Sequence, residues 1–157
     1  MFAEDRRAAT AVLINLQCDS MIGQQRIFCR EYRPLREAAP RFSRTSPPTT
    51  EEYRFFVLDS RVVASGFYWA NTAAEDLSIL PDADQPAVQA LLRQAINRIG
   101  QNCRFYVVDI AVMQDGRPII VELNDGQQAG LCCIDASAFY ASLLAVLSRP
   151  DGRLYCR

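Results

Sequence analysis

The sequence contains no lysine and no histidine. All 17 of its basic residues are arginine, against 18 acidic residues, so the formal net charge is −1. Without those two residue types the chain alone cannot build a Ser-His triad, an imidazole general base, a lysine Schiff base or a histidine-bearing zinc site. Its polar chemistry is therefore limited to carboxylate, guanidinium, amide, hydroxyl and thiol groups.

Three further features are missing. No apolar run reaches the roughly 18 residues that a membrane span needs, and the arginines do not gather into a basic segment of the kind that binds nucleic acid. The six cysteines include no C-x-x-C pair. We therefore expect a cytoplasmic protein with reduced thiols that binds neither nucleic acid nor membranes.

Half of the 157 residues are apolar, which is enough for the core of a single domain. Hydrophobic periodicity predicts three helices, a strand and two hairpins. In chain order these are a helix over residues 3–20, a strand over 26–35, a hairpin over 53–69, a helix over 84–99, a hairpin over 105–131 and a helix over 135–148. This order predicts an α+β fold with a mostly antiparallel sheet and helices packed on one face.

Several local features refine this prediction. In the first hairpin we expect a two-residue turn at Ser60-Arg61, after Asp59. Asp84 is expected to cap the second helix. Residues 36–52 contain three prolines and no apolar periodicity, so we expect an exposed loop that could serve as a lid or a binding loop.

The second hairpin, FYVVDIAVMQDGRPIIVELNDGQQAGL, carries oxygen-bearing side chains where a plain hairpin would place more valine or isoleucine. Glu122 and Asn124 are two residues apart on one strand, so their side chains leave the same face of the sheet. Asp109 lies about as far before the turn as Glu122 lies after it. The two carboxylates are therefore expected to be cross-strand neighbours.

Two carboxylates and an amide oxygen form a set of ligands that suits Mg²⁺ carrying nucleotide phosphates. The alternative is that Asp109, Glu122 and Asn124 are solvated polar residues on a half-exposed pair of strands. Spacing alone leaves both interpretations open.

The segment VVDIAV…DGRPIIVELNDGQQAGL resembles the closing motif of the ATP-grasp superfamily, in which an Asp and a Glu-x-Asn hold the magnesium of Mg-ATP. Its Asp-Gly-Gln-x-x-Gly-Leu end is similar to one small, poorly characterised clade. CREYRPL resembles the hinge strand of that clade, and EYRFFVLDSRVVASGFYW resembles its next hairpin. The matches follow the order of the family over residues 26–147. The resemblance implies the C-terminal, Mg-ATP-binding lobe of an ATP-grasp fold.

Carried over residue by residue, the resemblance implies that Asp109, Glu122 and Asn124 are the magnesium ligands. It also implies that Arg54 contacts the terminal phosphates of ATP and acts in catalysis, since a guanidinium binds phosphate oxygens at two points. The alternative for Arg54 is an ion pair on the surface of an edge strand.

The resemblance further implies that Arg30 and Glu31 hold the ribose and adenine of ATP in the hinge. For these two residues a purely structural role is the alternative. Gln127 and Gly130 would border the pocket of the acceptor substrate, where glycine allows close backbone approach; the alternative is a flexible turn.

If a complete site forms, the resemblance implies an ATP-dependent carboxylate–amine ligase. Mg²⁺ and Arg54 would neutralise the γ-phosphate during its transfer to a substrate carboxylate, and an amine would then attack the acyl phosphate. The donor and acceptor could be small molecules or peptides. Such chemistry needs little acid–base machinery, which suits a chain without histidine or lysine.

The chain is expected to form one ATP-grasp-like domain, in which residues 1–25 are a remnant of the first lobe and residues 26–148 are the nucleotide- and metal-binding lobe. The first lobe of the family commonly supplies lysine, which is absent here. The chain is then a truncated reading frame, a lobe that another polypeptide completes, or a non-catalytic nucleotide-binding or interaction module. A small α+β protein that ignores nucleotides is a further alternative.

Overall fold

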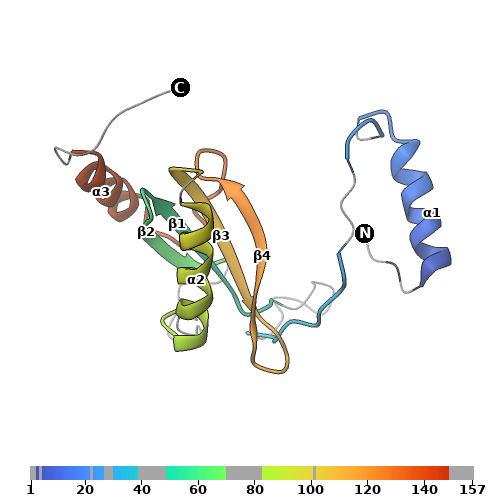
Figure 1. Cartoon of the computed structure of the whole chain (residues 1–157), viewed down its shortest axis with the longest axis horizontal. Coiled ribbons are helices and arrows are strands. Elements are labelled where there is room, and N and C mark those ends of the chain that lie inside the picture. Colours follow the sequence, from blue (N-terminus) through green and yellow to red (C-terminus); the bar gives the residue numbers. More distant parts are fainter. Residues whose placement is uncertain are drawn as a thin grey trace. The chain divides into compact units, whose positions relative to one another are not determined.

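The computed structural model describes residues 3, 5–21, 23–26, 30–38, 49–69, 83–100 and 102–148. The chain divides into two compact units, Met1–Arg33 and Pro34–Arg157. The helices and strands of the described residues follow one another in the order α1 (Arg6–Gln17), β1 (Glu52–Leu58), β2 (Arg61–Phe67), α2 (Pro86–Ile99), β3 (Phe105–Val112), β4 (Pro118–Asp125) and α3 (Ala136–Leu147) (Figure 1).

The smaller unit contains α1. Asp5 is its N-cap, and the Asp5 side chain accepts a hydrogen bond from the backbone N–H of Ala8 at 2.7 Å. The helix ends at Gln17, earlier than the predicted end near residue 20, and none of its residues is buried.

The larger unit is built on a four-stranded sheet with the strand order β2-β1-β3-β4, in which every neighbouring pair is antiparallel. Every residue of β1 is buried, because this strand lies inside the sheet and both faces are covered at its position. The edge strand β4 has no fully buried residue.

The β1–β2 turn differs by one residue from the predicted one. Leu58 faces Arg61, so the two turn residues are Asp59 and Ser60 and not Ser60-Arg61. Both turn residues have positive φ angles, 49° and 61°. A tight turn of this hand matches the twist of antiparallel strands, and Asp is among the few non-glycine residues that adopt it readily.

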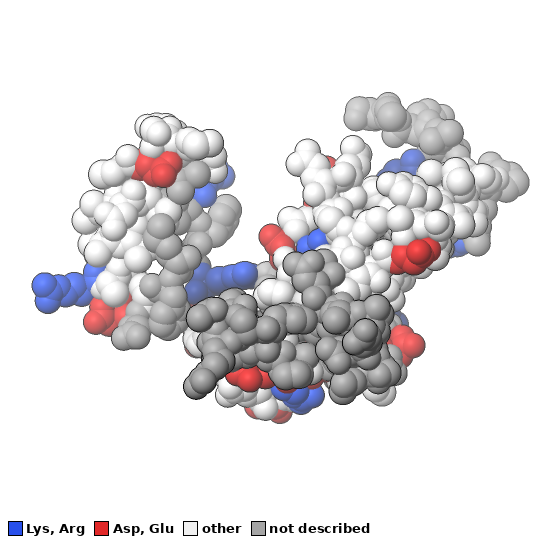
Figure 2. Space-filling view, turned by 180° about the vertical axis from the view of Figure 1, so that it is seen from behind, with Lys and Arg blue, Asp and Glu red and all other residues white. Residues whose placement is uncertain are grey.

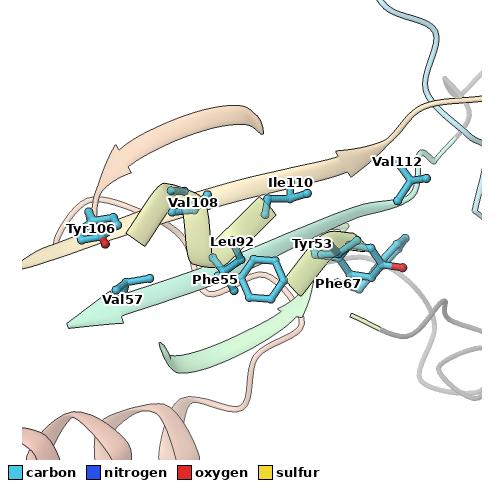
Figure 3. Packing of buried hydrophobic residues seen from close by; sticks show 11 residues of the cluster. Tyr53, Phe55, Val57, Phe67, Leu92, Tyr106, Val108, Ile110 and Val112 are labelled. Carbon is cyan, nitrogen blue, oxygen red and sulfur yellow. The ribbon is translucent and has the colours of Figure 1, made fainter. Parts of the chain in front are cut away.

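Each face of the sheet is covered by a separate cluster of apolar side chains. On one face Leu92 of α2 packs over residues of β1, β2 and β3, as Figure 3 shows for Phe55, Val108 and Ile110. On the other face Phe139 of α3 packs against Phe56, with ring centres 4.7 Å apart. The predicted α+β class with an antiparallel sheet is confirmed, but α2 and α3 lie on opposite faces and not on one.

The strand predicted over residues 26–35 is not formed in its described part. Residues 30–34 are irregular, and Leu35 makes a single bridge to Met113; residues 27–29 lie outside the described residues. Pro34 lacks the N–H that a paired strand needs. Its carbonyl instead accepts from the backbone N–H of Gln114 at 3.1 Å.

The ends of the predicted loop 36–52 are paired with each other. Glu37 and Thr50 form an isolated antiparallel bridge, and residues 39–48 lie outside the described residues. Helix α2 begins with Pro86 after the N-cap Gln85, so Asp84 is not the cap. Gln85 makes no capping hydrogen bond and instead donates to Glu51 Oε1 at 2.7 Å.

In Figure 2 the acidic and basic side chains of the described residues that are visible are interspersed. None of the helices in the described ranges combines the length and the hydropathy that would be needed to cross a membrane.

Candidate functional site

Three charged side chains form a row across the sheet. Arg54 of β1 lies directly opposite Asp109 of β3, and Asp109 lies directly opposite Glu122 of β4. Residues that face each other across antiparallel strands point to the same side, so all three side chains project from the face on which α3 packs. The predicted cross-strand pairing of Asp109 with Glu122 is confirmed. We call Arg54, Asp109 and Glu122 the charged row.

Arg54 and Asp109 form a buried ion pair with two hydrogen bonds. Arg54 Nε donates to Asp109 Oδ1 at 2.9 Å, and Arg54 Nη2 donates to Asp109 Oδ2 at 2.6 Å. Only 6% of the Arg54 side chain and 1% of the Asp109 side chain are exposed. The hydrogen bonds to Asp109 raise the pKa of Arg54 further above its usual range, so the guanidinium stays charged. The predicted alternative of a surface ion pair does not describe this buried arrangement.

Two more contacts hold the Arg54 guanidinium in place. Arg54 Nη1 donates to the carbonyl oxygen of Gly130 at 2.8 Å, and the guanidinium carbon lies 4.8 Å from the centre of the Tyr68 ring. The first contact ties β1 to the segment that follows β4, and the second is a cation–π interaction. Arg54 is therefore fixed from several sides.

Glu52 is a further carboxylate near the charged row, and it is not among the predicted site residues. It is 8% exposed and accepts a hydrogen bond from the Thr50 hydroxyl. Burial raises the pKa of Glu52; the Thr50 hydrogen bond opposes this effect, and the charges of Asp109 and Glu122 add to it. Because Glu52 stands two residues before Arg54, the period of the strand could have placed both on one face. The sequence predicts a hairpin that begins at residue 53, with Glu52 in the preceding loop.

Glu122 and Asn124 present oxygen atoms that the rest of the described chain does not bind. Glu122 is exposed and Asn124 is half-buried on the edge strand β4, opposite Asp109 and Val107. Across the described part of the chain, no group of three Asp, Glu or Cys side chains is placed to hold a metal ion. Two carboxylates and one amide are still an all-oxygen set on one sheet face, which is the donor chemistry that Mg²⁺ takes. In donor type these residues fit the ion.

Gln127 and Gly130 lie in the segment after β4. The backbone N–H of Gln127 donates to Asp125 Oδ1 at 2.8 Å, so the Asp125 side chain closes the turn. A Cβ at Gly130 would meet no atom within 4 Å, so a close approach of other described atoms does not account for this glycine. Gly126 differs, because a Cβ there would come within 2.7 Å of the Phe105 ring.

An open groove of about 700 Å³ lies where β3 begins, β4 ends and α3 passes. Asn124 and Gln127 both line it, together with mostly apolar residues that include Leu58, Phe105, Tyr106, Leu143 and Leu147. A predicted metal ligand and a predicted substrate contact therefore share one concave surface.

Arg30 and Glu31, the residues predicted to hold adenine and ribose, belong to the smaller unit. Glu31 accepts a hydrogen bond from Arg33 Nη2 at 2.8 Å, and the side chains of Glu31 and Arg33 are largely exposed. The role predicted for Arg30 and Glu31 stays a prediction.

The half-buried Cys132 is close to the charged row. Burial raises the pKa of the Cys132 thiol, while the positive charge of Arg54 opposes that rise. The net direction favours the neutral thiol, which is a poor nucleophile. Cys132 is therefore not a candidate for covalent catalysis.

A model of a known protein family matches most of the chain. The match extends over residues 3–143, and the family is described as an ATP-grasp domain, the third family of one ATP-grasp clade. The chain therefore belongs to this ATP-grasp family. ATP-grasp domains bind ATP, in general together with Mg²⁺. No curated protein and no solved structure matches the chain.

Proposed function

We propose that the chain binds Mg-ATP at the charged row and serves as the catalytic lobe of an ATP-dependent carboxylate–amine ligase. The observation that carries the proposal is the direct cross-strand placement of Asp109 and Glu122 in a chain that belongs to an ATP-grasp family. These two carboxylates and the Asn124 amide oxygen would hold the magnesium ion. The ion would offset the negative charge of the phosphates.

Arg54 has the chemistry to contact the terminal phosphates. A guanidinium has five N–H donors, and the contacts with Asp109 and Gly130 use three of them. The Cys132 thiol is also within hydrogen-bond reach of Arg54; it is a weak acceptor, so phosphate oxygens could take its place without disturbing the ion pair. Because the Arg54 side chain is 6% exposed, its charge acts with little screening by water.

The other predicted residues would bind the rest of the substrates. Arg30 and Glu31 would contact adenine and ribose, and Gln127 and Gly130 would border the acceptor. The position of Gln127 in the wall of the groove beside Asn124 supports an acceptor there. A second polypeptide would supply the first lobe and its phosphate contacts.

In the reaction, an oxygen of the substrate carboxylate attacks the γ-phosphorus of ATP, and ADP leaves. Arg54 stabilises the charge that the phosphoryl oxygens carry during this transfer. An amine then attacks the carbonyl carbon of the acyl phosphate, inorganic phosphate leaves and the amine nitrogen loses a proton to water. The product is an amide.

A second candidate is a module that binds the nucleotide without transferring its phosphate. The specific observation in its favour is that Asp109 and Gly130 already hold Arg54. With ATP, Mg²⁺ and pools of amino acids and peptides, the ligase forms ADP once a first lobe is added, whereas the binding module does not.

Calorimetric titration of ATP in the presence of Mg²⁺ tests the site itself. Glu122→Gln removes an exposed carboxylate, so the fold should survive and ATP affinity should fall at least about ten-fold. Asp115→Asn is the matched control, because Asp115 is an exposed carboxylate in the turn of the same hairpin. Unchanged affinity in Glu122→Gln would refute the proposed site.

A further inference from the structure

The Arg54–Asp109 ion pair places a positive charge against a carboxylate that is proposed to bind a cation. Both oxygens of Asp109 accept from Arg54, at 2.9 and 2.6 Å. Each carboxylate oxygen has a second lone pair, so Asp109, whose cross-strand neighbour is Glu122, keeps the capacity to coordinate a metal. Any cation bound there shares the carboxylate with the guanidinium.

Arg54 has little freedom to move away from such a cation. Its side chain is 6% exposed, and it is held by the Gly130 carbonyl and the Tyr68 ring as well as by Asp109. Leaving the pair would strand two charges inside the protein, which is strongly unfavourable. The repulsion between guanidinium and cation is therefore built into the site, and burial makes it stronger than it would be in water.

The same charge has the opposite effect on a nucleotide. The N–H groups of Arg54 that Asp109 and Gly130 do not use can donate to phosphate oxygens, and the attraction between guanidinium and phosphate is also strengthened by burial. Arg54 thus disfavours a bare divalent cation and favours a cation that arrives with phosphates.

We propose that Arg54 is a specificity-determining residue that makes metal binding at Asp109 depend on nucleotide, so that the lobe takes up the metal–ATP complex and rejects the free metal. This inference rests on the proposed function, in which Asp109 and Glu122 are metal ligands. It also predicts the direction of each effect of Arg54: removing its charge should raise the affinity for the free metal and lower the affinity for the nucleotide.

The experiment measures Mn²⁺ binding without nucleotide by electron paramagnetic resonance, and ATP binding at saturating Mn²⁺ by calorimetry. Arg54→Gln removes the charge but keeps an N–H donor for Asp109. We expect its affinity for Mn²⁺ alone to rise at least about ten-fold, and its affinity for ATP to fall. Arg54→Lys keeps the charge, so its affinity for Mn²⁺ alone should rise much less than that of Arg54→Gln.

Arg117→Gln is the matched control. Arg117 pairs with Asp115 in the turn of the same hairpin, so this variant loses an equal charge outside the row. It should change neither affinity. A ten-fold gain in Mn²⁺ affinity in this control would show that net charge, and not the position of Arg54, sets the effect, and would overturn the proposal.

Other outcomes separate this inference from the proposed function. A wild-type chain that binds no ATP with Mn²⁺ would overturn the proposed function. A wild-type chain that binds ATP, with Mn²⁺ affinity unchanged or lower in Arg54→Gln, would overturn only the role of Arg54. If Arg54→Gln does not fold, Arg54→Lys still decides: a ten-fold gain in its affinity for Mn²⁺ alone would contradict the proposal.

Discussion

Two Arg–Asp pairs of the larger unit have nearly the same geometry but different surroundings. In the Arg104–Asp59 pair, Nε and Nη2 each donate to a carboxylate oxygen at 2.7 Å, much as in the Arg54–Asp109 pair. Side-chain exposure is 42% and 33% in the Arg104–Asp59 pair, against 6% and 1% in the Arg54–Asp109 pair.

Hydrogen-bond geometry alone does not separate the two pairs; burial does. An exposed pair exchanges its partners with water at little cost, whereas a buried pair that loses one member leaves the other charged and unsolvated. Burial can therefore give the Arg54–Asp109 pair an electrostatic role in a site, while the Arg104–Asp59 pair chiefly closes the end of two strands.

The largest expected effect comes from removing one carboxylate of each pair. Asp109→Ala should lower the free energy of unfolding by about 3–5 kcal/mol, because it leaves the Arg54 charge buried without its partner. Asp59→Ala should cost far less, since water can solvate Arg104. Urea unfolding of both variants measures the difference, and equal losses would contradict the contrast.

A smaller effect on stability is expected when the guanidinium of each arginine is replaced by the ammonium group of a lysine. Arg54→Lys should lower the free energy of unfolding by about 1.5–3 kcal/mol, because a lysine cannot serve both oxygens of Asp109 and the Gly130 carbonyl together. Arg104→Lys is the control and should be nearly neutral. Thermal melts under identical conditions compare the two, and a loss at Arg104 as large as that at Arg54 would count against the role of burial.

The smallest effect concerns pH and has opposite signs in the two regions. Burial raises the pKa of Glu52 above its usual 4.5, so the native state keeps a proton that the unfolded chain releases. Above pH 4.5 the stability contribution of Glu52 therefore falls as pH rises, until pH passes the raised native pKa. Hydrogen bonds from Arg104 lower the pKa of Asp59 below 3.8; its contribution is present above that pH and is lost as pH falls through the native pKa.

Urea unfolding between about pH 3 and about pH 8 tests both signs. Relative to the wild type, Glu52→Gln should gain stability as pH rises, and Asp59→Asn should lose stability as pH rises from the acid end. If both variants shifted in the same direction, the assignment of burial to one carboxylate and ion pairing to the other would fail.

The elements close together in the chain were predictable. The second hairpin, its turn and the i, i+2 placement of Glu122 and Asn124 follow from a period of two around a short turn, and Asp135 caps α3 at the start of the predicted helix. The predictions were wrong where the structure of a segment depends on a partner that is distant in the sequence. Residues 30–34 have an alternating pattern but pair with no strand among the described residues, and the opposite placement of α2 and α3 depends on where each chain segment crosses the sheet.

By itself the sequence determined which chemistry is possible and that Glu122 and Asn124 share one face of their strand, because both depend on residue type and on separations of a few residues. Only the tertiary structure decided that β1 lies beside β3, which sets Arg54 against Asp109 across 55 residues of chain and buries Glu52 near them. The physical reason is that the packing of the whole core determines which distant strands pair. The local sequence pattern of β1 does not specify its neighbouring strand.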